Sequence, residues 1–325
     1  MEKMKVLITG ATGFVGPHLI HRLVSVPTTR RQIFGTCFPE HPESCADLCE
    51  KAPGLELLHL DLKSEMDVSD AVQSIRPEWI FHLASVSQVR VSWEKRKETL
   101  ETNLMGTFFL YEAVRRYAPK ARILFVSSSD VYGIPGPRHK PFGEGERLRI
   151  VSPYAFTKAS GELLSEFYAG VEKLNLVIAR PFPHTGPGQT ADFVCSDWGR
   201  QIALIEKTRP SSPAVKVGNL ETKRDYSDVR DVVRAYVMLM KKGRRGEVYN
   251  VCSGQAPALK TILRTLLTMS ARPIKVELDP AKLRKSDIPF LAGDNHKINR
   301  ETGWKPRIPL RQTLSDLLDF WRATV

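Results

Sequence analysis

The chain has 325 residues, 42% of them hydrophobic and 26% charged, which suits a soluble protein with one large α/β domain and a smaller appendage. The formal net charge of +12 is spread in short clusters, so a diffuse field for a phosphorylated ligand is favoured over a nucleic-acid partner. No stretch is long and apolar enough to cross a bilayer, and the N-terminal apolar run is too short for a signal peptide. We therefore expect a cytoplasmic protein without a membrane partner.

Apolar strands alternate with helices over the first 180 residues. Strands are predicted within residues 5–9, 32–38, 55–62, 78–85, 121–133 and 174–182. A turn and helix are predicted over 10–24, and further helices over 64–75, 99–117 and 152–170. The strands are apolar on both faces, which is typical of a parallel sheet covered by helices on both sides.

The pattern changes after Arg180, where proline and glycine cluster in RPFPHTGPGQ. We expect residues 1–180 to form a dinucleotide-binding domain, to which a late strand near 246–253 returns. Residues 181–325 are expected to form mainly a smaller, discontinuous substrate-binding lobe with a terminal amphipathic helix at 313–322.

The five cysteines are an odd number and lack the spacing of metal ligands. Free thiols in a reducing cytosol and no metal site are therefore expected. The cysteines are Cys37, Cys45, Cys49, Cys195 and Cys252.

The first strand is followed by GATGFVG, which contains Gly10, Gly13 and Gly16. Glycine permits a tight turn and close approach of the backbone to a pyrophosphate, and N–H groups at the start of the next helix face the phosphates. Three spaced glycines are often only a turn, and the spacing is GxxGxxG rather than GxGxxG. The strand–turn–helix context nevertheless favours a dinucleotide site.

The end of the second strand bears on the choice of dinucleotide. An acidic residue there would accept the adenosine ribose hydroxyls and favour NAD, but residues 37–38 are Cys and Phe, and Glu40 lies slightly beyond. Two arginines at 30–31 lie upstream without forming an unambiguous clamp for a 2′-phosphate. We expect NADP, with NAD as the alternative. Asp61 could contact adenine or cap the next helix, and the glycine turn favours the adenine role.

In SPYAFTKAS, Tyr154 and Lys158 lie one helical turn apart on one face. A nearby ammonium would lower the pKa of the tyrosine from about 10, and the tuned phenol could protonate a carbonyl oxygen while hydride reaches its carbon. The YxxxK pattern alone is frequent on helix surfaces. The serine run at 127–129, which could also only cap a turn, ends the fifth strand and supplies a hydroxyl for the substrate oxygen. The combination indicates a hydride-transfer site.

With these motifs the chain resembles the extended short-chain dehydrogenase/reductase family, the NAD-dependent epimerases and dehydratases. The resemblance covers essentially the whole chain and rests on TGATGFVG, DL at 61–62, HLAS at 82–85, TNLMGT at 102–107, SSSDVYG and SPYAFTK. It implies an α/β Rossmann fold, that is, a doubly wound parallel sheet, with a smaller α/β lobe. It also implies a homodimer formed through a four-helix bundle of the helices near 100–117 and 153–170.

The resemblance also implies roles for single residues. Ser128, Tyr154 and Lys158 would be catalytic. The residues expected at the cofactor are Gly10, Thr12, Gly13, Phe14, Val15, Gly16, Asp61, Leu62, Leu83, Ala84, Ser85, Asn103, Tyr154 and Lys158. The residues expected at the substrate are Ser87, Ser129, Lys216, Arg224, Arg284 and Asp287.

The second half resembles the GDP-sugar branch of this family, in HTGPGQ, VKVGNLETKRDYSDVRDVVRAY and LRKSDIPFLAGDN. This implies NAD(P)H-dependent reduction of the C4 keto group of GDP-4-dehydro-6-deoxy-D-mannose to GDP-D-rhamnose. Arg224 and Arg284 would bind the diphosphate, for which guanidinium groups are suited. The alternative is GDP-mannose 4,6-dehydration, or another nucleotide-sugar dehydratase or epimerase. Dehydration requires removal of the C5 proton, and Asp130 reaches less far than glutamate, so reduction is favoured.

The chain departs from the family at RPFPH, where RxFNH is usual. Pro183 has no amide side chain, so a substrate contact is lost or is supplied by His184 or Gln189. A third hypothesis is a dinucleotide-binding protein without turnover that contacts RNA. The intact catalytic residues argue against it, as does the lack of aromatic residues interleaved with basic ones.

Overall fold

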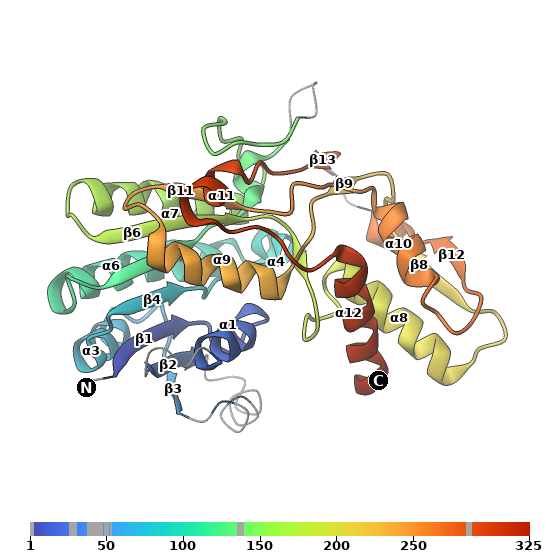
Figure 1. The fold of residues 1–325 in the computed structure, drawn as a ribbon, viewed down its shortest axis with the longest axis horizontal. Helices are drawn as coiled ribbons and strands as arrows, with labels where there is room; N and C mark the ends of the chain where they lie inside the picture. The colour runs from blue at the N-terminus through green and yellow to red at the C-terminus, as the bar shows by residue number, and fades with distance from the viewer. Residues whose placement is uncertain are drawn as a thin grey trace.

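The computed structural model describes residues 3–25, 31–37, 48, 52, 54–134, 140–283 and 288–325. At its centre lies a parallel seven-stranded sheet in the order β11-β6-β5-β4-β1-β2-β3 (Figure 1). The strands are β1 (Met4–Thr9), β2 (Arg31–Cys37), β3 (Leu55–His59), β4 (Trp79–His82), β5 (Arg122–Val126), β6 (Asn175–Pro181) and β11 (Val248–Val251). Strand order reverses between β1 and β4, which is where doubly wound folds bind ligands. The predicted Rossmann fold is confirmed.

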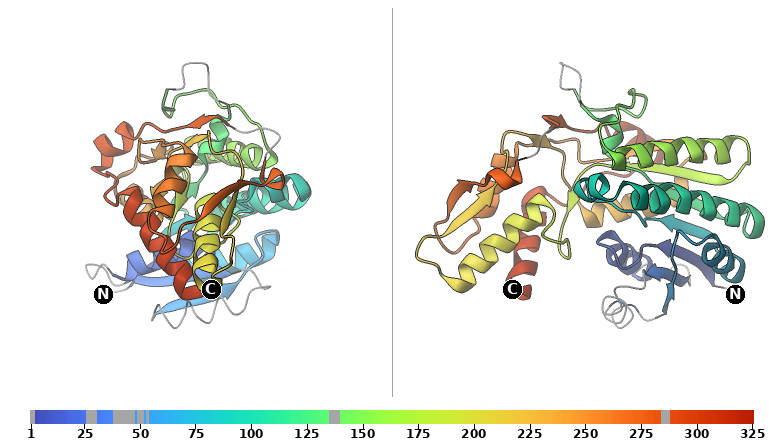
Figure 2. Two further views of the ribbon diagram at one scale, coloured as in Figure 1. Left: turned by 90° about the vertical axis from the view of Figure 1, so that its right-hand side faces the viewer. Right: turned by 180° about the vertical axis from the view of Figure 1, so that it is seen from behind.

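Helices cover both faces of this sheet because neighbouring strand residues are buried on opposite sides. Val6 packs with α1 (Val15–Val24), α9 (Val229–Lys242) and α11 (His296–Thr302), whereas Leu7 packs with the helices of the other face. Those helices are α3 (Glu65–Ile75), α6 (Gly106–Tyr117) and α7 (Pro153–Gly170). Seen from behind, α6 and α7 run side by side across this face (Figure 2).

The predicted helix over 99–117 is divided into pieces. Helices α4 (Val89–Glu94) and α5 (Arg96–Leu100) precede a π-helical turn, η1 (Glu101–Met105), which leads directly into α6. π-Helical turns are rare and often mark functional sites. Here the turn contains the buried Asn103, a residue expected at the cofactor.

A smaller lobe has its own apolar core. It contains α8 (Val194–Thr208), β8 (Ala214–Val217), α10 (Leu259–Leu267), β12 (Lys275–Leu278) and α12 (Leu310–Thr324). Short elements connect it to the large sheet, namely β7 (His184–Thr185), β9 (Lys223–Arg224), β10 (Ser227–Asp228), β13 (Phe290–Leu291), η2 (Ser129–Tyr132) and η3 (Pro280–Lys282). None of the helices in the described ranges has the length and apolar character needed to span a membrane.

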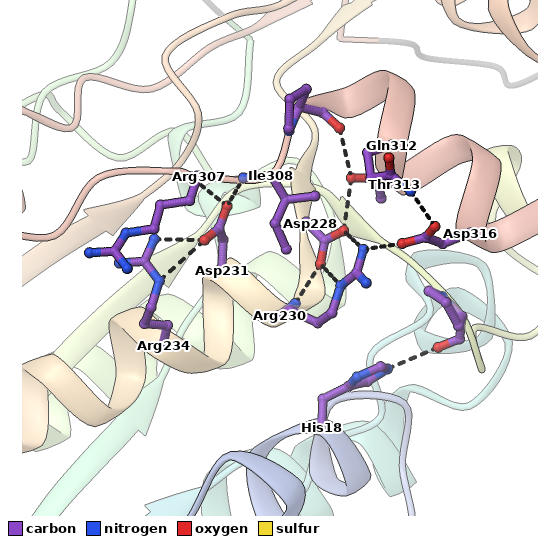
Figure 3. Close-up of polar contacts among 12 residues, drawn as sticks. His18, Asp228, Arg230, Asp231, Arg234, Arg307, Ile308, Gln312, Thr313 and Asp316 are labelled. Carbon is purple, nitrogen blue, oxygen red and sulfur yellow. Dashed lines mark hydrogen bonds and ion pairs between the residues drawn. The ribbon is translucent and has the colours of Figure 1, made fainter. Parts of the chain in front are cut away.

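Buried carboxylates at the start of α9 fasten the lobe to the large domain (Figure 3). Asp228 caps α9 by accepting from the backbone N–H of Arg230 at 2.7 Å, and the Arg230 guanidinium bridges Asp228 to Asp316 of α12 at 2.7 and 2.6 Å. Asp231 accepts the backbone N–H groups of residues 307 and 308 at 2.6 and 2.8 Å. The helix on the sheet and the last helix of the lobe are therefore held together by charge-assisted hydrogen bonds.

Candidate active site

The glycine turn lies at the carboxyl end of β1, against the segment that follows β4. Gly10 has φ +70°, and a Cβ at this position would lie 2.8 Å from the Cα of Ala84. A Cβ on Gly16 would overlap the carbonyl of Ala11, so the helix can pack this closely only on glycine. Gly13 is exposed, and the nearest atom to a Cβ there would be the Gly10 carbonyl oxygen at 3.4 Å. The turn therefore presents bare backbone in front of α1.

The other residues of this turn are half-buried and pack against the loop that follows β6. The Phe14 ring stacks on the His184 ring, with centroids 6.0 Å apart and an interplanar angle of 11°. One turn later, His18 Nε2 lies 2.9 Å from the carbonyl oxygen of Pro187 (Figure 3). Thr12 and Val15 flank Phe14 in this turn. The turn expected at the cofactor thus contacts the loop that leads into the lobe.

At the carboxyl ends of β2 and β3, the structure changes two expectations. Arg31 begins β2, at the end of the sheet opposite the glycine turn, and donates to the Leu23 carbonyl at 2.7 Å, so it does not serve as a 2′-phosphate clamp. Asp61 does not cap α3: it accepts from the Lys63 backbone at 2.9 Å, and Ser64 is the cap. Leu62 is buried, so only its backbone could face a cofactor. Residues Arg30, Phe38, Glu40, Cys45 and Cys49 lie outside the described residues, whereas Cys37, Cys195 and Cys252 are buried free thiols.

Asn103 organises the segment that follows β4. Its Oδ1 accepts from the Val86 N–H at 2.8 Å, and its Nδ2 donates to the Val86 carbonyl at 3.2 Å and to Thr157 Oγ1 at 3.0 Å. Asn103 therefore joins η1, this segment and α7. The segment contains Leu83, Ala84 and Ser85, which are half-buried, and Ser87, which is exposed.

His82 is a functional candidate that sequence reasoning did not assign. Its Nδ1 lies 2.8 Å from Thr9 Oγ1 and its Nε2 lies 2.9 Å from Thr107 Oγ1. Thr107 donates to the Asn103 carbonyl at 2.6 Å, so it accepts from His82 Nε2–H. Burial, and then the charge of Lys158, lowers the pKa of His82 to about 3. A neutral histidine therefore links β1, β4 and η1. A histidine within an otherwise apolar strand was the available signal.

The three predicted catalytic side chains meet at the carboxyl end of β5. Ser152 caps α7, which places Tyr154 and Lys158 on one buried face of this helix. Lys158 Nζ donates to the Val126 carbonyl at 2.8 Å and lies 5.9 Å from the centroid of the Tyr154 ring. Ser128 accepts from the Asp130 N–H at 3.1 Å and hydrogen-bonds the Tyr154 hydroxyl.

The predicted acidification of Tyr154 is wrong for the protein alone. Burial, followed by the charge of Asp130, raises the pKa of Tyr154 above its ordinary value, and the Ser128 hydrogen bond opposes this only in part. Burial also lowers the pKa of Lys158 to about 7, against an ordinary 10.5. Desolvation disfavours both charged forms and outweighs the attraction between them. At neutral pH the site therefore holds a protonated phenol, which is suited to donate a proton.

The residues expected at the substrate lie on both sides of the connection between the domains. Ser129 is buried in η2 beside Ser128. Lys216 is exposed on β8, and Arg224 is half-buried on β9. Arg284 and Asp287 lie outside the described residues.

The loop that contains Pro183 uses both residues that were expected to replace the missing asparagine. Gln189 accepts from Thr185 Oγ1 at 2.6 Å and donates to the His184 carbonyl at 3.0 Å, so its amide is occupied within the loop. The His184 ring lies on Phe14, and its Nδ1 is 3.0 Å from the Phe182 carbonyl. These residues shape the loop.

A groove of about 580 Å³ lies in the lobe, next to Lys216 on β8. It is mainly apolar, and Asn219 supplies an amide. Such a surface suits the flat face of a base. Its lining residues are Val217, Gly218, Asn219, Leu220, Val276, Leu278 and Leu283.

Comparisons with known proteins agree with this geometry. The family model described as GDP-mannose 4,6 dehydratase matches residues 7–317. A GDP-6-deoxy-D-mannose reductase from Pseudomonas aeruginosa is 31% identical over 99% of this chain and 98% of the relative. A GDP-mannose 4,6-dehydratase from Vibrio cholerae is 25% identical over 98% of this chain and 93% of its own. The structure of RMD from Pseudomonas aeruginosa complexed with NADPH matches with a TM-score of 0.85 at 29% identity, covering 99% of this chain and 100% of the other.

A parallel doubly wound sheet with a glycine turn at its first crossover, and a Ser/Tyr/Lys site after β5, define an extended short-chain dehydrogenase/reductase. This prediction from the sequence is confirmed. Within that class, the chain belongs to the GDP-mannose 4,6-dehydratase family, whose model spans nearly its whole length.

Proposed function

We propose that this chain is an NADPH-dependent reductase that converts GDP-4-dehydro-6-deoxy-D-mannose to GDP-D-rhamnose. The observation that carries the proposal is the protonated Tyr154 hydroxyl, hydrogen-bonded to Ser128, with Lys158 one turn away. Carbonyl reduction requires a proton donor at the oxygen, and a phenol with a raised pKa remains protonated at neutral pH. The match to RMD with NADPH supports the choice of cofactor.

The residues present fit a dinucleotide. The exposed backbone at Gly13 and the start of α1 form a cradle for a pyrophosphate, and a side chain at Gly10 would collide with Ala84. When bound, NADPH supplies the hydride. Lys158 would hold the nicotinamide ribose hydroxyls.

The proton moves through this chain's own residues. Ser128 would hold the C4 oxygen of the sugar, and Tyr154 would donate its proton to that oxygen. The ammonium of Lys158 would stabilise the negative charge that then forms on the phenol. Asn103 and His82 fix the segment on the cofactor side of the site.

Reduction is favoured over 4,6-dehydration by the residues after β5 and by the comparisons. The stretch reads Ser128-Ser129-Asp130, and Asp130 raises the pKa of Tyr154 by its charge. This effect keeps the proton on the phenol, as reduction requires. The relative at 31% identity is a reductase, whereas the dehydratase from Vibrio cholerae reaches 25%.

We propose that the nucleotide lies across the connection to the lobe. Arg224 and Lys216 are placed to meet the diphosphate, with Ser87 and Ser129 toward the sugar, and the apolar groove beside β8 suits guanine. Arg284 and Asp287 complete the proposed set.

We also propose a homodimer formed through α6 and α7. Large apolar side chains are exposed on α5, η1, α6 and α7, where monomers rarely leave a continuous patch uncovered. A second copy with the same patch would bury both in a four-helix bundle. The exposed residues are Leu100, Met105, Phe108, Phe156, Leu163 and Phe167.

The function is tested by following NADPH oxidation with GDP-4-dehydro-6-deoxy-D-mannose and, separately, with GDP-mannose. We expect NADPH consumption with the keto sugar alone. Conversion of GDP-mannose to the 4-keto sugar without net cofactor consumption would instead establish the dehydratase. Tightly bound stoichiometric NADP in the purified protein would favour that outcome, since a dehydratase retains its cofactor through the cycle.

A further inference from the structure

Behind the catalytic side chains lies a charged pair that the proposed chemistry does not use. Glu162 of α7 and Arg180 of β6 are each 5% exposed. Their contact is bidentate, with Nη2–Oε2 at 2.6 Å and Nε–Oε1 at 2.8 Å. A buried ion pair contributes little net stability because desolvation offsets its attraction. Its neighbours therefore indicate its role.

Glu162 and Lys158 hold consecutive residues at the end of β5. Lys158 Nζ donates to the Val126 carbonyl at 2.8 Å, and Ser127 Oγ donates to Glu162 Oε1. Lys158 and Glu162 lie one turn apart, so α7 holds this strand end with a cation and an anion on adjacent turns. The next residue is Ser128, which hydrogen-bonds Tyr154.

Arg180 extends this network to other elements. Its Nη1 donates to the Tyr132 hydroxyl at 2.9 Å and to the Glu144 carbonyl at 3.0 Å. Tyr132 in turn donates to Asn250 Oδ1 at 2.7 Å. The arginine therefore ties β6 to η2 and β11, and Glu162 cannot move without disturbing them.

We propose that Glu162, clamped by Arg180, is a positioning residue that fixes the strand end carrying Ser128 and keeps the Lys158 ammonium charged beside Tyr154. This inference rests on the proposed function. The negative charge of Glu162 opposes the effect of burial on the pKa of Lys158. On the elements around α7, the titratable groups that face this site are His82 of β4, Asp130 of η2, Tyr236 of α9 and Arg180 of β6, whereas Arg90 and Glu94 of α4 are exposed.

Glu162→Gln removes the anion and leaves the arginine. We expect the alkaline limb of kcat/KM for keto-sugar reduction to move to lower pH by about one unit or more, because Lys158 loses its proton more easily. Glu162→Gln with Arg180→Met removes both charges, and its limb should lie between those of the single variant and the wild type. Glu166→Gln changes the same charge on an exposed position of α7 and should leave the limb in place.

A ¹³C-lysine NMR titration, with the Lys158 signal assigned from Lys158→Met, reports the same charge without turnover. A downward shift in Glu162→Gln supports the inference even if the wild type does not reduce the keto sugar, in which case only the proposed function fails. The inference is overturned if the wild type is active and Lys158 titrates alike in the wild type and both Glu162 variants. If the single variant does not fold, the double variant decides, since paired neutral replacement of a buried ion pair is usually tolerated.

Discussion

Substitution of Gly10 by alanine should destabilise the folded chain and remove dinucleotide binding. An L-residue at φ +70° costs roughly 1–2 kcal/mol. The new Cβ would lie 2.8 Å from Ala84 Cα and 2.9 Å from Ala84 N, and these backbone atoms cannot turn away as a side chain could. Such overpacking adds about 1–3 kcal/mol, so the free energy of unfolding should fall by about 2–5 kcal/mol.

Two other glycines separate the strain from the collision. Gly303 has φ +79° with no atom within 4 Å of its Cβ position, so Gly303→Ala should cost only the strain, about 1–2 kcal/mol. Gly170 ends α7 without a positive φ and without a close atom. Gly170→Ala should leave stability unchanged or raise it by about 0.5–1 kcal/mol.

Urea unfolding followed by circular dichroism measures the three costs, and a fluorescence titration with NADPH measures binding. The order of destabilisation should be Gly10→Ala, then Gly303→Ala, then Gly170→Ala, and only the first should lose NADPH. Equal costs for the first two would show that the turn does not pack on Ala84. Undiminished NADPH affinity in a folded Gly10→Ala protein would show that the dinucleotide binds elsewhere.

Three further outcomes are expected. Tyr154→Phe should lower kcat by about 10²-fold or more in the NADPH oxidation assay and leave the NADPH Kd largely unchanged; parallel losses of both would make the tyrosine structural. Between pH 7 and 10.5 the unfolded chain binds more protons than the folded one at Lys158, so this residue makes the fold more stable as pH rises through that window. Lys158→Met should therefore be the more stable protein near pH 6, by no more than about 5 kcal/mol, and lose this advantage by about pH 10 in urea unfolding; a difference independent of pH would contradict the buried cation. Phe108→Glu with Phe167→Glu should yield a monomer in sedimentation, whereas Val24→Glu on α1 should not, and an unchanged dimer would exclude α6 and α7 as the interface.

Sequence reasoning succeeded where the signal was local. The glycine turn at Gly10 and Gly16, the apolar strands and the Ser152 cap of α7 each follow from residues close together in the chain. The alternation of strand and helix then leaves few topologies, because parallel strands need right-handed crossovers. The pairing of Tyr154 with Lys158 depends only on one helical turn.

Sequence reasoning failed where the outcome depended on burial. The ammonium beside Tyr154 was expected to acidify it, but desolvation of both groups prevails, and Arg31 lies at the wrong end of β2. Likewise, no local pattern indicates that Glu162 would meet Arg180, which is 18 residues away on another element.

The amino-acid sequence by itself determined the class of fold, the glycine turn and the identity of the three side chains at the reacting end, because backbone preference and helical spacing act over a few residues. Only the tertiary structure decided which of those side chains carry charge and what holds them, namely His82, Asn103 and the Glu162–Arg180 pair. The reason is that the energy of a charge depends on how much water and which distant groups surround it, and folding alone sets both.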